Sequence, residues 1–75
     1  MLKLELGFND GIISGDIMRD VVEIFPEFES SFQQRKSYDE YYYSPMEVEV
    51  SLEQIEKLTE YYAVEISNGH LTIKS

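Results

Sequence analysis

The chain has 75 residues with fifteen acidic side chains, six basic side chains and one histidine, so its formal net charge is −9 at pH 7. This length allows one domain, and we expect residues 1–75 to form a single acidic domain. The absence of cysteine excludes disulfides, thiol nucleophiles and thiolate metal ligands. The excess of acid argues against direct binding to nucleic acid or to an anionic membrane, because both would repel the protein.

The N-terminal residues alternate leucine with charged residues, which predicts a half-buried strand rather than a targeting signal. Its apolar side would consist of Leu2, Leu4, Leu6 and Phe8. No uncharged stretch approaches the roughly 20 residues that a membrane-spanning helix needs, so we expect a cytoplasmic protein. After a turn, the next segment predicts a helix capped by Ser14 or Asp16 and ended by Pro26. The polar face of this helix carries Asp16, Asp20 and Glu23.

The middle of the chain is the part that the sequence determines least. Pro26 can open a second, short helix. That helix would turn three aromatic side chains toward the core: Phe25, Phe28 and Phe32. The sequence does not otherwise predict the structure of residues 27–44. Residues 38–43 fit either a loop or an extended segment.

The C-terminal half carries stronger local signals. Residues 46–50 alternate as a strand, and Ser51 with Gln54 fits a capping box at the start of a helix. The apolar stripe of that helix, which we expect to end near Tyr62, comprises Leu52, Ile55, Leu58, Thr59 and Tyr62. Residues 63–75 then predict a hairpin, because Asn68-Gly69 suits a two-residue type I′ turn.

The hairpin register places Ile66 opposite Leu71 and Val64 opposite Ile73, so that four apolar side chains share one face. Together these elements indicate an α+β fold. We expect a small, mostly antiparallel sheet of about four strands, with two or three helices on one face and a β-hairpin at the C-terminal end.

Motifs for catalysis or cofactor binding are absent from the sequence. His70 is the only histidine, and we interpret it as a surface residue on the polar face of the predicted hairpin. The sequence contains no phosphate-binding loop, dinucleotide fingerprint or calcium loop. We therefore expect a protein that is not an enzyme and that uses neither a cofactor nor a metal ion.

Several acids occupy positions that local rules do not favour. Glu60 lies near the negative end of its predicted helix and one turn from Glu56, and glutamate is a poor strand former at positions 47 and 49. The candidate partner-binding acids are Asp39, Glu40, Glu47, Glu49, Glu53, Glu56 and Glu60. The alternative interpretation is that these acids are solvated faces that keep the domain soluble.

Four of the six tyrosines cluster between positions 38 and 43. Consecutive aromatic side chains cannot all point inward, and exposed tyrosines are effective interface anchors. We therefore add Tyr41, Tyr42 and Tyr43 to the candidate partner-binding residues. The alternative is that their rings cover a thin core while the hydroxyls reach water.

In size, charge and lack of catalytic groups, the chain is similar to small acidic inhibitor proteins such as phage anti-defence proteins, DNA mimics and immunity proteins. This resemblance of type implies a non-catalytic protein that docks on a basic surface of a partner, for example a nucleic-acid-binding protein. A second hypothesis is a structural or accessory module that self-associates or pairs through its first strand or through the Tyr41–Tyr43 segment. A third is an enzyme that uses acid pairs with a divalent ion. The oligomeric state and the identity of the partner stay open.

Overall fold

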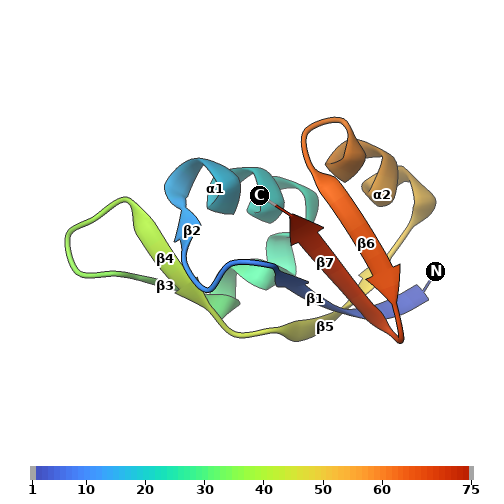
Figure 1. Ribbon diagram of the computed structural model, residues 1–75, viewed down its shortest axis with the longest axis horizontal. Helices are drawn as coiled ribbons and strands as arrows, with labels where there is room; N and C mark the ends of the chain where they lie inside the picture. Colours follow the sequence, from blue (N-terminus) through green and yellow to red (C-terminus); the bar gives the residue numbers. More distant parts are fainter. Residues whose placement is uncertain (1, 75) are drawn as a thin grey trace.

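The structure is a computed structural model that describes residues 2–74. Figure 1 shows strands and helices in a mixed order, which confirms the expected α+β class. The elements are β1 (Leu2–Phe8), β2 (Ile13–Ser14), α1 (Gly15–Ile24), the 3₁₀ helix η1 (Pro26–Ser31), β3 (Phe32–Gln34), β4 (Glu40–Tyr43), β5 (Met46–Val50), α2 (Leu52–Thr59), β6 (Ala63–Ser67) and β7 (His70–Lys74).

The main sheet has four strands in the order β5-β1-β7-β6. Two of its pairings, β1 with β5 and β6 with β7, are antiparallel, whereas β1 and β7 run parallel. The first strand therefore lies inside the sheet: residues 2–6 pair with β5 and residues 5–8 pair with β7. Much of the backbone of β1 is thus paired within the main sheet, which leaves less of this strand for pairing with another chain.

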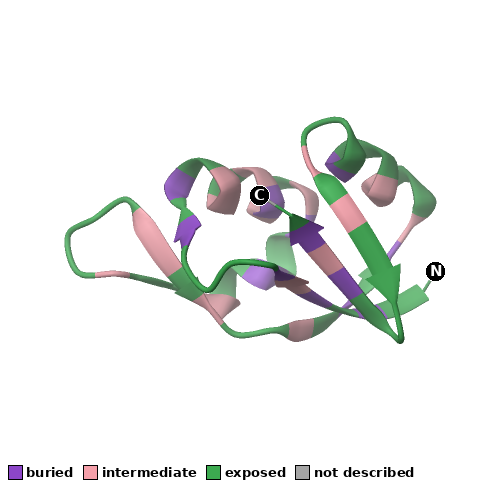
Figure 2. Cartoon of the chain, viewed as in Figure 1, coloured by how far each residue is buried: buried purple, intermediate pink, exposed green. Residues whose placement is uncertain are grey.

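One face of the main sheet builds the core, as the alternation in β1 predicts. Leu4, Leu6 and Phe8 are buried, whereas Leu2 at the start of the strand is 57% exposed. The buried face of β1 therefore begins at Leu4, and not at Leu2 as expected. The neighbouring strands and the helices contribute the other buried side chains: Ile13, Val21, Phe25, Phe28, Val48, Val50, Leu58, Leu71 and Ile73. Figure 2 shows these buried positions along β1 and β7 and on the helix surfaces that face them.

The undetermined middle of the chain forms a second, three-stranded antiparallel sheet with the order β2-β4-β3. Tyr43 at the end of β4 joins this sheet to the main one. Its hydroxyl donates to the Phe8 carbonyl oxygen at 2.9 Å and accepts from the Phe8 N–H at 3.3 Å. The Phe8 ring also lies 4.9 Å from the Tyr43 ring and 6.2 Å from Phe28, in edge-to-face arrangements that are typical of stable aromatic cores.

Helix ends follow the predicted capping chemistry. The Ser14 side chain accepts a hydrogen bond from the Ile17 N–H and caps α1, and η1 begins at Pro26. At α2, the Gln54 N–H donates to the Ser51 hydroxyl and the Ser51 N–H donates to the Gln54 side chain, which completes the capping box. The Gln54 amide also donates to the Ile24 carbonyl oxygen at 3.0 Å, so this cap ties the start of α2 to the end of α1.

The predicted stripe of α2 is wrong at two positions. Leu58 is fully buried and Ile55 packs against the core, but Leu52 is 71% exposed and Thr59 also faces solvent. The helix ends at Thr59 rather than near Tyr62. An eight-residue helix makes little more than two turns, so only its central apolar residues reach the sheet and Leu52 in the first turn projects beyond it.

The C-terminal hairpin has the predicted register, with Val64 opposite Ile73 and Ile66 opposite Leu71. Asn68 and Gly69 form the turn with φ values of 52° and 77°, as a type I′ turn requires. Leu71 is fully buried, but Ile66 stays 45% exposed, because β6 is an outer strand of the sheet. The last residue of the predicted hairpin segment, Ser75, lies outside the described residues.

The hairpin turn yields a stability prediction. Replacing Gly69 with valine puts a β-branched side chain at a positive φ and should lower the free energy of unfolding by about 1 kcal/mol or more. Chemical denaturation of the two proteins measures this difference. Gly11→Ala is the matched control, because a Cβ at Gly11 meets no atom within 4 Å, and it should shift the midpoint little. An unchanged midpoint for Gly69→Val would contradict the turn type.

The burial of α2 yields a second prediction. Leu58→Ala leaves a cavity in the core and should lower the free energy of unfolding by about 2–5 kcal/mol. Leu52→Ala, in the same helix, removes an exposed side chain and should change it by less than about 0.5 kcal/mol. Equal losses for the two variants in a urea titration would show that α2 packs through a different face.

Candidate functional site

A groove runs between α1 and α2 and continues past the end of β5. It consists of two adjoining depressions of about 270 Å³ and about 390 Å³ that share Glu23, Ile24 and Lys57 in their walls. Carboxylates dominate the lining, with Lys57 as the one cation among the described residues that line it. The six acids are Asp20, Glu23, Glu27, Glu49, Glu53 and Glu60. We call this feature the acidic groove.

Helical periodicity explains how the sequence gathers these acids. On the α1 side they stand at positions 20, 23 and 27, and on the α2 side Glu53 and Glu60 flank Lys57. Spacings of three, four and seven residues place side chains on one face of a helix, which accounts for Asp20 with Glu23 and for the α2 side. Glu27 instead comes from η1, after the chain has left α1 at Phe25. Glu49 joins them from the end of β5, one residue before the strand gives way to the Ser51 cap.

The carboxylates of the acidic groove are mostly not neutralised. Lys57 Nζ lies 3.6 Å from the Glu53 carboxylate, and both side chains are exposed, so this pair contributes little to stability. Within residues 2–74, no basic side chain lies within 4.0 Å of the carboxylates of Glu23, Glu27 and Glu60. These exposed charges create a negative potential that favours the approach of cations.

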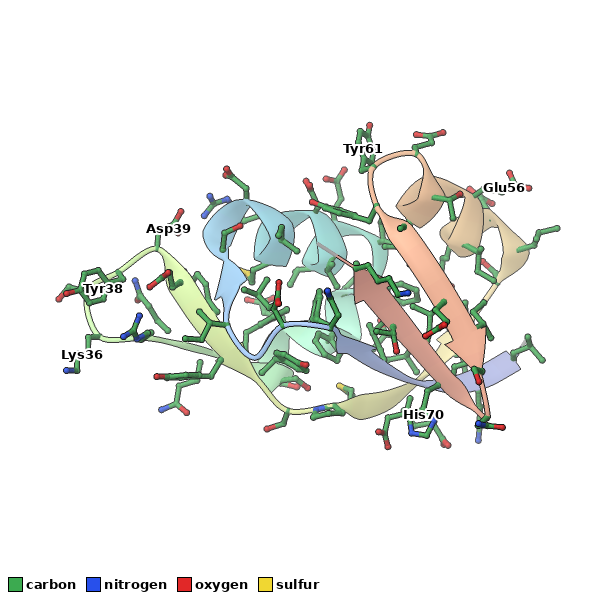
Figure 3. The ribbon with its side chains drawn as sticks, in the orientation of Figure 1. Lys36, Tyr38, Asp39, Glu56, Tyr61 and His70 are labelled. Carbon is green, nitrogen blue, oxygen red and sulfur yellow. The ribbon has the colours of Figure 1, made fainter. Side chains whose placement is uncertain are left out.

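A partly buried hydrogen bond connects the two sides of the acidic groove. The Tyr62 hydroxyl donates to the Asp20 carboxylate at 2.6 Å, and it joins α1 to the segment that follows α2. Burial, then the hydrogen bond to Asp20, raise the pKa of Tyr62 to about 12. The next aromatic residue, Tyr61, lines the groove but is 71% exposed, and Figure 3 shows its side chain projecting from the molecule.

The structure places the predicted acids of β5 and α2 at three different locations. Glu49, Glu53 and Glu60 line the acidic groove. Glu56 is exposed on α2 but does not line it (Figure 3). Glu47 stands opposite Glu5 in the β1–β5 pairing, on the outer face of the main sheet.

The predicted acids of the second sheet are ion-paired. Asp39 lies 3.4 Å from the Arg19 guanidinium, which also holds Asp16 at 2.8 Å. Glu40 lies 2.9 Å from Arg35. Asp39 in addition covers Gly15, where a Cβ atom would collide with its carboxylate. Asp39 thus holds the second sheet against α1, whereas the Glu40–Arg35 pair closes the β3–β4 hairpin within that sheet.

Of the three predicted tyrosine anchors, two make contacts inside the fold and one is largely exposed. Tyr43 is half-buried in the joint with Phe8, and Tyr41 presents its ring edge to Phe32 at 6.3 Å. Tyr42 is 47% exposed. All three lie on β4, the central strand of the second sheet, which is far from α2 along the long axis of the molecule (Figure 1). The tyrosine segment and the acidic groove are therefore separate surfaces.

The three α1-side acids of the groove were not among the residues predicted from the sequence. Asp20 and Glu23 were assigned to the polar face of the first helix, and Glu27 lies beyond Pro26 in η1. The available signal was the three-residue spacing of Asp20 and Glu23 on one helix, whereas Glu27 lies beyond the end of α1 and carried no such signal. Only the packing of α1 beside α2 shows that the two stripes face one groove.

The single histidine of the chain lies outside the acidic groove. His70 lies on the outer sheet face with its Nε2 atom 3.4 Å from Glu5 and its Nδ1 atom 2.9 Å from the Asn68 carbonyl oxygen, and all these groups are exposed. Residues 2–74 contain no group of three or more His, Asp or Glu side chains arranged to hold a metal ion. None of their helices has the length and apolar character that crossing a membrane requires.

Comparisons with protein-family models, with curated proteins and with solved structures find no match to this chain.

The hydrogen bond between Tyr62 and Asp20 predicts alkaline sensitivity. The tyrosine pKa is raised from 10 in the unfolded chain to about 12 in the folded protein, so only the folded state keeps this proton between pH 10 and 12. The stability that this difference provides is fully present below pH 10 and should fall by no more than about 2 kcal/mol as the pH rises to 12.

Denaturation of the wild-type protein and Tyr62→Phe at several pH values between 9 and 12 measures this effect. The variant should lose about 1 kcal/mol at neutral pH and show a flatter decline above pH 10. Parallel curves for the two proteins above pH 10 would show that Tyr62 is not the titrating group.

Proposed function

We propose that this protein is a non-catalytic binding protein that docks on a basic surface of a partner protein, such as the surface with which a nucleic-acid-binding protein holds phosphates. The observation that carries this proposal is the acidic groove, in which six carboxylates surround a single lysine. Exposed carboxylates on rigid helices can occupy the positions of phosphate groups between lysine and arginine side chains.

The mechanism follows from the location of the charges. A net charge of −9 attracts a cationic partner over a long distance and accelerates encounter. The acids on both sides of the groove then accept hydrogen bonds from cationic side chains. The Tyr61 ring at the groove provides the apolar contact area of an interface anchor.

A pair of charge-matched variants tests this proposal. Glu23→Gln with Glu60→Gln removes two charges from the groove, and Glu47→Gln with Glu56→Gln removes two charges outside it. The net charge changes equally, so any difference between the two proteins reports the location of the binding surface. None of these four side chains makes an ion pair within 4.0 Å with a described residue, so both double variants should fold.

Affinity capture from a lysate of the source cell, followed by quantitative mass spectrometry, identifies what the wild-type protein binds at low salt. We expect partners with basic surfaces whose recovery falls about three- to tenfold with the groove variant and little with the control variant. For a purified partner, the loss should come from a slower association rate and should shrink at high salt. Equal recovery with both variants would refute the groove as the docking surface.

A further inference from the structure

The outer edge of β6 carries backbone groups that the fold does not use. In a hairpin closed by a two-residue turn, Ser67 and His70 exchange hydrogen bonds, and the hydrogen-bonded pairs then alternate along the strands. Val64 and Ile66 therefore direct their N–H and C=O groups away from β7. No hydrogen bond among the described residues uses these outward groups.

The two edges of the main sheet differ in protection. β5 follows Pro45 and carries two acids, Glu47 and Glu49. Proline and charged side chains are common devices that block strand pairing. β6 contacts α2 and carries one acid, Glu65, but it contains no proline, and Ile66 is 45% exposed at this edge. The β6 edge is thus the one at which the main sheet can accept another strand.

We propose that β6 binds an extended, basic segment of the partner as a fifth strand of the main sheet. This inference rests on the proposed function, because it names the way in which a basic partner is held. Side chains alternate between the two faces of an added strand. A segment that alternates apolar and basic residues would cover Val64 and Ile66 on one face and present lysine or arginine to Glu65 on the other.

Charge selects this occupant over a second copy of the chain. Two copies would each bring a net charge of −9 to the interface. If two β6 strands paired antiparallel with Val64 opposite Ile66, the two Glu65 side chains would lie directly opposite each other, which is destabilising. A basic segment instead gains an ion pair with Glu65. The existing ion pair of Glu65 with Lys74 is solvent-exposed and long, at 4.0 Å, so it competes little with this new contact.

The test uses ¹⁵N-labelled protein and two nine-residue peptides, one alternating lysine with valine and the other alternating glutamate with valine. At low salt the lysine peptide should shift the amide signals of Val64 and Ile66. Ile66→Pro removes the outward N–H without removing a ladder bond and should weaken binding by about tenfold or more. Ile66→Val keeps the N–H and should bind like the wild-type protein.

A charge reversal gives an independent measurement if the proline variant does not fold. Glu65→Lys should reverse the preference, so that the glutamate peptide shifts the β6 signals more than the lysine peptide does. Lysine-peptide shifts confined to α1 and α2 would overturn strand addition and leave the proposed function standing. Equal binding of both peptides at β6 would overturn the basic partner. A dimer of the free protein that Ile66→Pro abolishes would overturn the proposed occupant.

Discussion

The position of β1 between β5 and β7 is the constraint on which the rest of the structure depends. Because β1 lies between these two strands, its Leu4, Leu6 and Phe8 side chains form the centre of the core that residues 2–74 build. The helices pack on that face, and Tyr43 holds the second sheet to the end of the same strand. α1 and α2 pack side by side on this small apolar surface, and the acidic groove lies between their exposed faces.

The distribution of cations determines where negative charge remains. Both arginines neutralise acids that connect α1 to the second sheet or close its hairpin. Lys57 is the cation that lines the groove among the described residues, and its ion pair is with Glu53 on the same helix. The like charges that face each other across the groove weaken the fold at low salt. A cationic partner would relieve this repulsion, so binding and stability should be coupled.

Sequence reasoning succeeded where the signal is local. The Asn68-Gly69 turn and the Ser51–Gln54 cap involve residues at most a few positions apart, and both have the predicted geometry. The second sheet was not predicted, because the β3–β4 hairpin places Lys36 rather than glycine or asparagine at its positive φ, and because β2 pairs with β4 from a distant part of the chain. The candidate site was partly predicted: Glu53 and Glu60 follow from the pattern of one helix, whereas Glu23 required knowledge of which helix lies beside α2.

The parallel pairing of β1 with β7 also has a consequence for the order of folding. Its paired residues Phe8 and Ile73 lie at opposite ends of the chain, so the centre of the sheet forms by closing a long loop, whereas the β6–β7 hairpin forms from neighbouring residues. Until these two parts meet, β1 exposes an unpaired apolar edge. The net charge of −9 opposes contact between partly folded chains at that edge, because the chains repel each other.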